Sequence, residues 1–77
     1  MATASILTQT VHQRTRKGQM VAAAQPPMLD EAHTMLLRLF NGFTPTEWLV
    51  EKASVFLAQP DVIAQELERS GLIERVH

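Results

Sequence analysis

The side chains that could do chemistry in this sequence are few, and their spacing forms no recognised site. The chain has three histidines and no cysteine, so thiol catalysis and thiolate metal sites are excluded. His12, His33 and His77 have no second metal ligand three or four residues away apart from generic carboxylates, so we expect them on the surface. None of the serines can be assigned a histidine and an acid, or has the glycines of a nucleophile elbow around it. The sequence therefore predicts no catalytic site, no metal site and no cofactor.

Residues 30–33 read Asp-Glu-Ala-His, the tetrapeptide of a helicase motif in which the acids position magnesium and the attacking water. The sequence lacks the glycine-rich phosphate loop and the preceding apolar strand that this chemistry needs. Helix physics explains both acids, because Asp30 is a favoured N-cap and Glu31 is stabilised by the positive end of a helix dipole. We therefore interpret the tetrapeptide as the start of a helix.

Charge is divided unevenly along the chain. Residues 1–27 contain Arg14, Arg16 and Lys17 and no acid, whereas residues 28–77 contain eight acidic and four basic side chains. A basic arm therefore precedes an acidic body. The composition of the first stretch fits two interpretations. It is either an organelle transit peptide or a frayed N-terminus followed by a short ordered arm.

Length and hydropathy limit the class of protein. Seventy-seven residues give room for one domain with a small core. No apolar run approaches the roughly 18 to 20 residues that cross a bilayer. The absence of cysteine favours a reducing compartment. We therefore expect a soluble cytoplasmic protein with no membrane partner.

The acidic body carries the start and stop signals of three helices. Asp30 is the N-cap candidate of the first helix, and Gly42 can end it in a left-handed conformation. Pro60 fits the first turn of the third helix, and Gly71 is expected to stop it, with Leu72 folding back on the last turn. Apolar side chains recur at helical spacing in each segment. The expected helices cover residues 30–41, 45–57 and 60–70.

The second helix has the clearest local signal. Thr44 as N-cap, Pro45 at the first helical position and Glu47 three residues after the cap form a predicted capping box. This register places Leu49 and Ala53 on one face of the helix, which we expect to be buried.

A short C-terminal strand is expected after the third helix, because residues 72–76 alternate weakly and are rich in β-formers. Its only candidate partner within the chain is the arm between Val11 and Ala24, a stretch that fits either a strand or a helical turn. The pair Pro26-Pro27 should end whatever precedes it. We therefore predict a mainly α fold with short flanking strands. Its parts are a disordered segment over residues 1–10, a basic arm over 11–27 and a three-helix domain over 28–77.

The order of these elements resembles that of winged helix-turn-helix domains. Residues 67–76, Leu-Glu-Arg-Ser-Gly-Leu-Ile-Glu-Arg-Val, are similar to the junction of the third helix and the first wing strand in many bacterial regulators of that superfamily. Four upstream segments look like the layout of small proteobacterial winged-helix-like proteins. They are residues 14–18, 29–37, 41–42 and 44–49. The resemblance implies a three-helix, winged-helix-like core.

DNA binding is one hypothesis that the resemblance raises. A winged helix inserts its third helix into the major groove, where phosphates and base edges demand basic or amide side chains. The expected third helix instead offers Asp61, Glu66 and Glu68, which would repel the duplex. A DNA-binding regulator would therefore depend on the basic arm and a few further arginines. The candidate phosphate contacts are Arg14, Arg16, Lys17, Arg69 and Arg75.

The aromatic side chains raise a second hypothesis. Phe40, Phe43, Trp48 and Phe56 are all the aromatic rings of the chain other than histidine, and they suit either a small core or an interface. Methionines also serve either as core filler or as an adaptable surface. We favour a non-enzymatic regulatory or protein-interaction module whose partner is another protein or a second copy. The candidate interface residues are Phe43, Trp48, Met20 and Met35.

Overall fold

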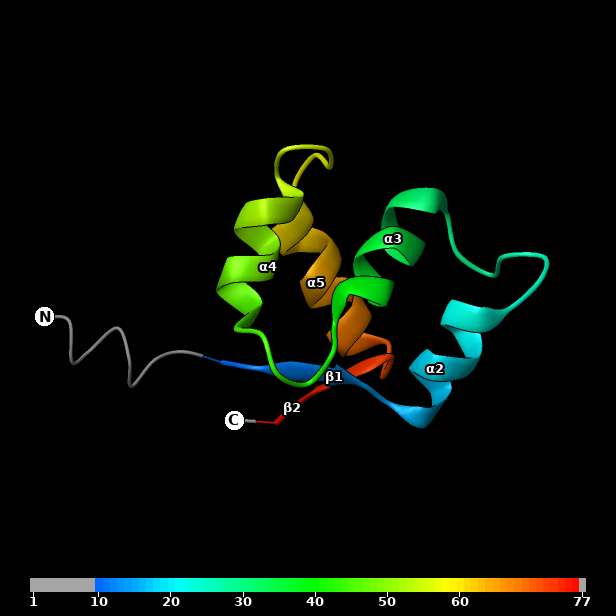
Figure 1. Ribbon diagram of the computed structural model, residues 1–77. Coiled ribbons are helices and arrows are strands. Elements are labelled where there is room, and N and C mark those ends of the chain that lie inside the picture. Colours follow the sequence, from blue (N-terminus) through cyan, green and yellow to red (C-terminus); the bar gives the residue numbers. More distant parts are fainter. Residues whose placement is uncertain (1–9, 77) are drawn as a thin grey trace, which may run out of the picture.

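The computed structural model describes residues 10–76, which form helices packed over a two-stranded sheet (Figure 1). The first 9 residues of the expected disordered segment lie outside this range. No helix in the described part of the chain is long and apolar enough to cross a membrane. The mainly α prediction with short strands is confirmed, and one helix lies within the expected basic arm. The elements are β1 (His12–Arg14), α2 (Arg16–Ala23), α3 (Glu31–Leu39), α4 (Thr46–Ala53), α5 (Pro60–Arg69) and β2 (Ile73–Arg75).

The two strands join the beginning and the end of the described chain. They pair antiparallel, with His12 opposite Arg75 and Arg14 opposite Ile73. In Figure 1 they run side by side along one side of the helices. The expected pairing of the arm with the C-terminal strand is therefore confirmed.

The other edge of β1 meets the segment that leads into α4. Val11 forms an antiparallel bridge with Pro45, and the N–H of Thr46 donates to the carbonyl of Thr10 at 2.8 Å. The N–H of Gly42 donates to the carbonyl of His12 at 3.2 Å. Strand β1 is thus held on both edges, and β2 is the outer strand.

Helix α2 forms within the stretch whose sequence fits either a strand or a helical turn. Thr15 is its N-cap, and its hydroxyl accepts a hydrogen bond from the N–H of Gly18 at 3.0 Å. Val21 and Ala22 face the core. The helix ends at Ala23, before the proline pair, as expected.

The first turn of α2 is bonded to the end of α5. The N–H of Thr15 donates to the carbonyl of Leu72 at 3.0 Å, and its hydroxyl donates to the carbonyl of Gly71 at 2.7 Å. Gly18 lies so close to Leu72 that a Cβ built on it would be 1.9 Å from the Leu72 carbonyl oxygen. Only glycine fits at this point in the helix.

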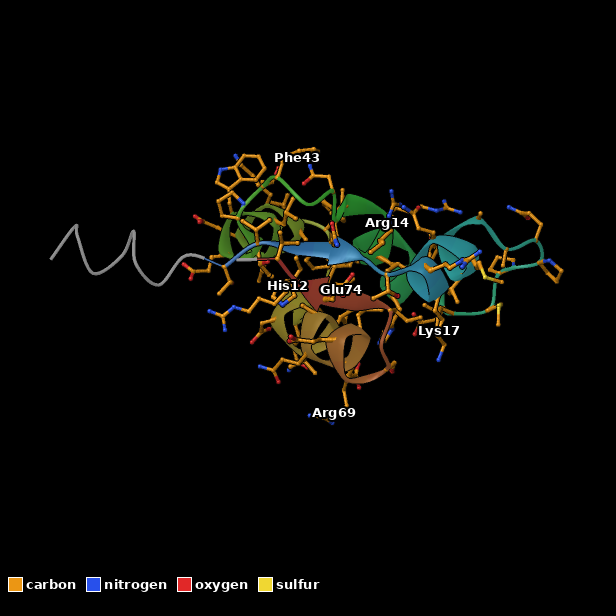
Figure 2. The ribbon with its side chains drawn as sticks, turned by 90° about the horizontal axis from the view of Figure 1, so that it is seen from below. His12, Arg14, Lys17, Phe43, Arg69 and Glu74 are labelled. Atoms are coloured by element: carbon orange, nitrogen blue, oxygen red, sulfur yellow. The ribbon has the colours of Figure 1, made fainter. Side chains whose placement is uncertain are left out.

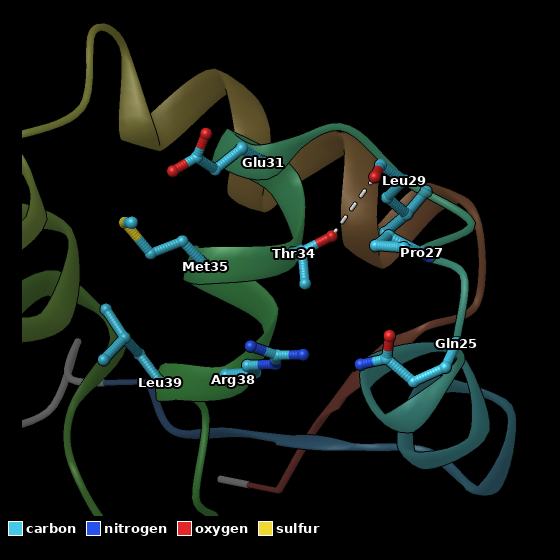
Figure 3. Close-up of a pocket in the computed structure, with 8 residues that line it drawn as sticks. All are labelled: Gln25, Pro27, Leu29, Glu31, Thr34, Met35, Arg38 and Leu39. Atoms are coloured by element: carbon cyan, nitrogen blue, oxygen red, sulfur yellow. Dashed lines mark hydrogen bonds between the residues drawn. The ribbon is translucent and has the colours of Figure 1, made fainter.

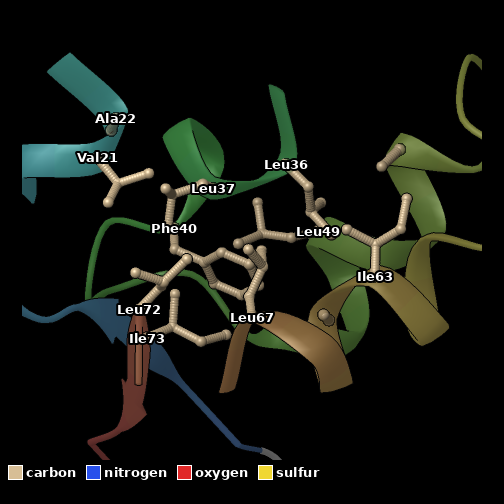
Figure 4. Close-up of a cluster of buried hydrophobic side chains, with 12 residues drawn as sticks. Val21, Ala22, Leu36, Leu37, Phe40, Leu49, Ile63, Leu67, Leu72 and Ile73 are labelled. Atoms are coloured by element: carbon tan, nitrogen blue, oxygen red, sulfur yellow. The ribbon is translucent and has the colours of Figure 1, made fainter. Parts of the chain in front are cut away.

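The core gathers around Phe40, which follows α3 (Figure 4). All four helices of the described chain and β2 contribute side chains to it. The largest fully buried side chains are Phe40, Leu36, Leu37 and Leu67. Leu49 and Ala53 are buried on α4, as its helical spacing predicts.

The predicted capping box of α4 is wrong. Pro45 is the N-cap, its backbone is extended, and no side chain caps the helix. The hydroxyl of Thr44 instead accepts from the side-chain amide of Asn41 at 3.0 Å. Because the N–H of Thr46 is taken by Thr10, the helix starts from main-chain pairing with the arm. It also ends at Ala53, four residues earlier than expected.

The two glycines expected to stop helices behave differently. Gly71 has a φ of 76° and completes a hydrogen-bonded stop in which its N–H reaches Glu68 and the N–H of Leu72 reaches Leu67, both at 3.0 Å. This prediction is confirmed. Gly42 also has a positive φ of 82°, but α3 ends earlier, at Leu39, so Gly42 shapes the following loop and not the helix end.

The contact of Gly18 with Leu72 makes a stability prediction. Alanine favours a helix over glycine by about 0.5 to 1 kcal/mol, but a methyl group here would overlap a backbone oxygen that cannot rotate away. We expect Gly18→Ala to lower the free energy of unfolding by about 1 to 3 kcal/mol, as overpacking does. Urea denaturation measures it. The matched control, Gln19→Ala on the exposed side of α2, should change the free energy by less than about 0.5 kcal/mol. A Gly18→Ala variant as stable as wild type would contradict this close approach.

Candidate functional site

The four predicted interface residues are all exposed, but on different parts of the molecule. The exposed fractions are 86% for Phe43 and 52% for Trp48, which belong to the loop before α4 and to α4 itself. Met20 lies on α2 and Met35 on α3. The candidate set therefore divides into an aromatic pair beside α4 and two separate methionines.

Two further apolar side chains join the aromatic pair. Val55 and Phe56 follow the end of α4 and are 85% and 55% exposed. Trp48 lies within α4 and Val55 lies in the turn after its end at Ala53, and the Nζ of Lys52 lies 5.2 Å from the centre of the Trp48 ring. We call Phe43, Trp48, Val55 and Phe56 the α4 apolar surface. From the sequence, Phe56 suited either the core or an interface and Val55 was not singled out, because the helix was expected to continue to residue 57.

The aromatic rings are thus split between core and surface. Phe40 is fully buried, whereas Phe43, Trp48 and Phe56 are more than half exposed. The three exposed rings belong to α4 and to the loops at its two ends. The alternative that all four rings fill the core is wrong.

His12 is buried, and the expectation that it lies on the surface is wrong. It alternates with the exposed Gln13 on β1, so its ring points into the molecule. Its Nδ1 lies 2.6 Å from the Thr46 hydroxyl and its Nε2 lies 3.3 Å from a carboxylate oxygen of Glu68. The ring also stands edge-on to Phe40, with centroids 6.0 Å apart. His12 therefore links β1 to α4 and α5.

His33 forms a second link to α5. Its Nδ1 lies 2.7 Å from Asp30 and its Nε2 lies 2.7 Å from Glu66. Because a carboxylate only accepts hydrogen bonds, this arrangement favours a doubly protonated ring. The hydrogen bond to Glu66, helped by Asp30, raises the pKa of His33 above its ordinary 6.5. Hydrogen bonds from the backbone and ring of His33 lower the pKa of Asp30 below 3.8.

Helix α5 keeps its acidic side chains at the surface. Asp61, Glu66 and Glu68 are all exposed, although the last two contact histidines. Asp61 and Glu68 line a cavity of about 240 Å³ between α4, α5 and the sheet, together with Glu47 of α4. We call it the acidic cavity. The exposed surface of α5 therefore carries three acidic side chains and one arginine, Arg69.

The candidate phosphate contacts do not lie on one surface. Figure 2 shows Arg14 and Arg69 on opposite sides of the sheet. The Nζ of Lys17 lies 3.4 Å from the carbonyl of Ser70, at the C-terminal end of α5, where a positive charge is favourable. Arg16 is exposed in the first turn of α2, and Arg75 lies on the outer strand.

A larger groove lies between α3 and the loop that joins it to α2 (Figure 3). Its volume is about 640 Å³, and Leu29, Met35 and Leu39 supply apolar lining. The guanidinium of Arg38 lines it too, but donates through two nitrogens to the carbonyl of Ala22 at 3.2 and 3.1 Å. Arg38 therefore ties α2 to α3 at this groove.

Within the described residues, no three histidine or acidic side chains converge as a metal site. Comparison with protein-family models, with curated proteins and with solved structures gave no match. The functional argument therefore starts from the α4 apolar surface and the acidic cavity.

The raised pKa of His33 predicts a pH-dependent stability. A raised pKa stabilises the fold below the ordinary histidine pKa of 6.5, and this contribution is lost as the pH rises through the folded-state value. Wild type should therefore exceed His33→Gln in unfolding free energy most clearly at about pH 5.5, with a smaller difference at about pH 8.5. Urea denaturation of both proteins at each pH checks this. Glu66→Gln should weaken the same pH dependence, whereas a wild-type advantage that does not change with pH would count against the pair.

Proposed function

We propose that this protein is a non-enzymatic protein-interaction module on a winged-helix-like scaffold. It binds another protein through the α4 apolar surface. The absence of cysteine from the whole chain is consistent with action in the reducing cytoplasm.

The exposure of Phe43, Trp48, Val55 and Phe56 carries the proposal. Aromatic side chains are enriched at interface hot spots, because they bury a large apolar area at a low cost in side-chain entropy. Leaving them in water forgoes roughly 25 cal/mol for each Å² of apolar surface that a partner would cover. Val55 and Phe56 also lie outside regular helix, so their exposure is no consequence of packing a long helix.

A different protein fits this surface better than a second copy does. A two-fold dimer places the same patch of both chains face to face. Beside Trp48 that would place Glu47 and Glu51 of both copies in one interface, with one Lys52 from each to offset them. A partner with apolar and basic side chains meets no such repulsion.

The charge of the neighbouring helix supports a protein partner over DNA. Asp61, Glu66 and Glu68 are exposed on α5, and a DNA duplex carries about one negative charge for each 1.7 Å of its axis. DNA binding by the basic arm is the competing function. Measuring duplex binding by the same preparation separates the two.

We expect the double variant Phe43→Ala/Trp48→Ala to bind the partner at least about 30-fold more weakly, the loss typical of one hot-spot residue. The partner would be found by cross-linking with wild type, purified, and titrated against each variant by calorimetry. Because both side chains are exposed, the variant should keep its fold, which circular dichroism checks.

The matched control is Met20→Ala/Met28→Ala, which removes two apolar side chains that are 69% and 70% exposed elsewhere. It should bind as wild type does. Equal binding of the purified partner by the aromatic double variant would refute the proposal. So would a preparation that binds only duplex DNA.

A further inference from the structure

The acidic cavity is lined by both apolar and acidic residues. Val50, Ala64 and Ile73 line it from α4, α5 and β2, and the last two are almost fully buried. The acidic residues Glu47, Asp61 and Glu68 line it as well. No arginine or lysine is among its lining residues.

The carboxylates are only partly used within the fold. Glu68 contacts the buried His12 at 3.3 Å, and His12 is also bonded to Thr46. Among the described residues, the side chains of Glu47 and Asp61 have no hydrogen-bond or ion-pair partner. The cavity therefore offers two free carboxylates beside one that is already oriented.

The separation of the acidic side chains determines which kind of cation can bind in the cavity. In the described structure these acids do not converge on one point as the ligands of a metal ion would. A long basic side chain meets the arrangement better, since its methylene stem packs on apolar surface while its head reaches polar groups. A guanidinium adds five donors in a plane, enough to reach separate carboxylates.

We propose that the acidic cavity receives a basic side chain, arginine or lysine, from the protein that binds the α4 apolar surface. This rests on the proposed function and names the chemistry of its partner. Glu47 and Trp48 are consecutive on α4 and about 100° apart around it, so a segment that covers Trp48 with an apolar residue needs a long basic side chain to reach around the helix to the cavity. The partner segment is thus both apolar and basic.

The test is a nuclear magnetic resonance titration of the whole chain with three small probes. They are arginine and lysine, each blocked at both ends as acetyl and methylamide, and the equally blocked citrulline, which has the shape of arginine without its charge. We expect arginine or lysine to shift the amide signals of Thr46, Glu47 and residues 61–68 saturably, and citrulline to leave them unmoved. The stronger of the two basic probes identifies the preferred head group.

Variants locate the binding. Glu47→Gln and Asp61→Asn should each lower the affinity for the basic probe by about three- to fivefold, as expected for a partly exposed ion pair. Glu51→Gln removes the same charge from α4 outside the cavity and should have no effect. Equal shifts with citrulline, shifts confined to other residues, or an equal loss in Glu51→Gln would overturn the inference.

Failure of this inference can be told from failure of the proposed function. Phe43→Ala/Trp48→Ala should still bind the blocked amino acid, because neither residue lines the cavity. If the partner protein loses affinity for that double variant but not for Glu47→Gln or Asp61→Asn, the cavity inference falls and the proposed function stands. If duplex DNA shifts the same cavity amides, both fall.

Discussion

The backbone carbonyl of Leu72 is the point at which the two ends of the fold are held together. It accepts the N–H of Thr15 and lies against Gly18, so the start of α2 sits on the end of α5. Leu72 also comes directly before β2, which pairs with β1 on the other side of Thr15. One residue thus fixes a helix, a strand and a helix end against each other. In a domain too small for a large core, such closure makes the core possible.

The surface around α4 follows from this closure. With β1 fixed by β2, its free edge pairs with Pro45 and Thr46 and sets where α4 begins. The helix then buries Leu49 and Ala53 and must turn Trp48 outward, since residues one position apart differ by about 100° on a helix. Its early end leaves Val55 outside as well. The exposed aromatic group is therefore a product of strand pairing as much as of the local sequence.

The sequence predicted the features that depend on neighbouring residues along the chain. It also predicted the strand pairing, because all other segments were excluded as partners. Asp30, Pro60 and Gly71 begin or end helices through local hydrogen bonds and fixed dihedrals, and the strand pairing followed because only one segment was available. The rest depends on contacts between distant residues. Gly18 disfavours an isolated helix but is needed where Leu72 approaches, and the burial of His12 depends on which face of β1 meets the helices. In the candidate site, Phe43 and Trp48 were named in advance, whereas the cavity lined by α4 and α5 emerges only when the helices pack.

Electrostatics connects the cavity with the apolar surface. His12 contacts Glu68 and His33 contacts Glu66, so two of the acidic side chains of α5 have histidine partners within the fold. Asp61 lies in the first turn of α5, and no side chain within residues 10–76 pairs with it. A nucleic acid cannot supply the compensating charge, since its backbone has the same sign. In the proposed complex a protein segment supplies it, and its apolar residues cover the aromatic side chains of Phe43 and Trp48. Each feature alone occurs on ordinary surfaces, and their combination on α4 supports the proposal of a partner that is apolar and basic at once.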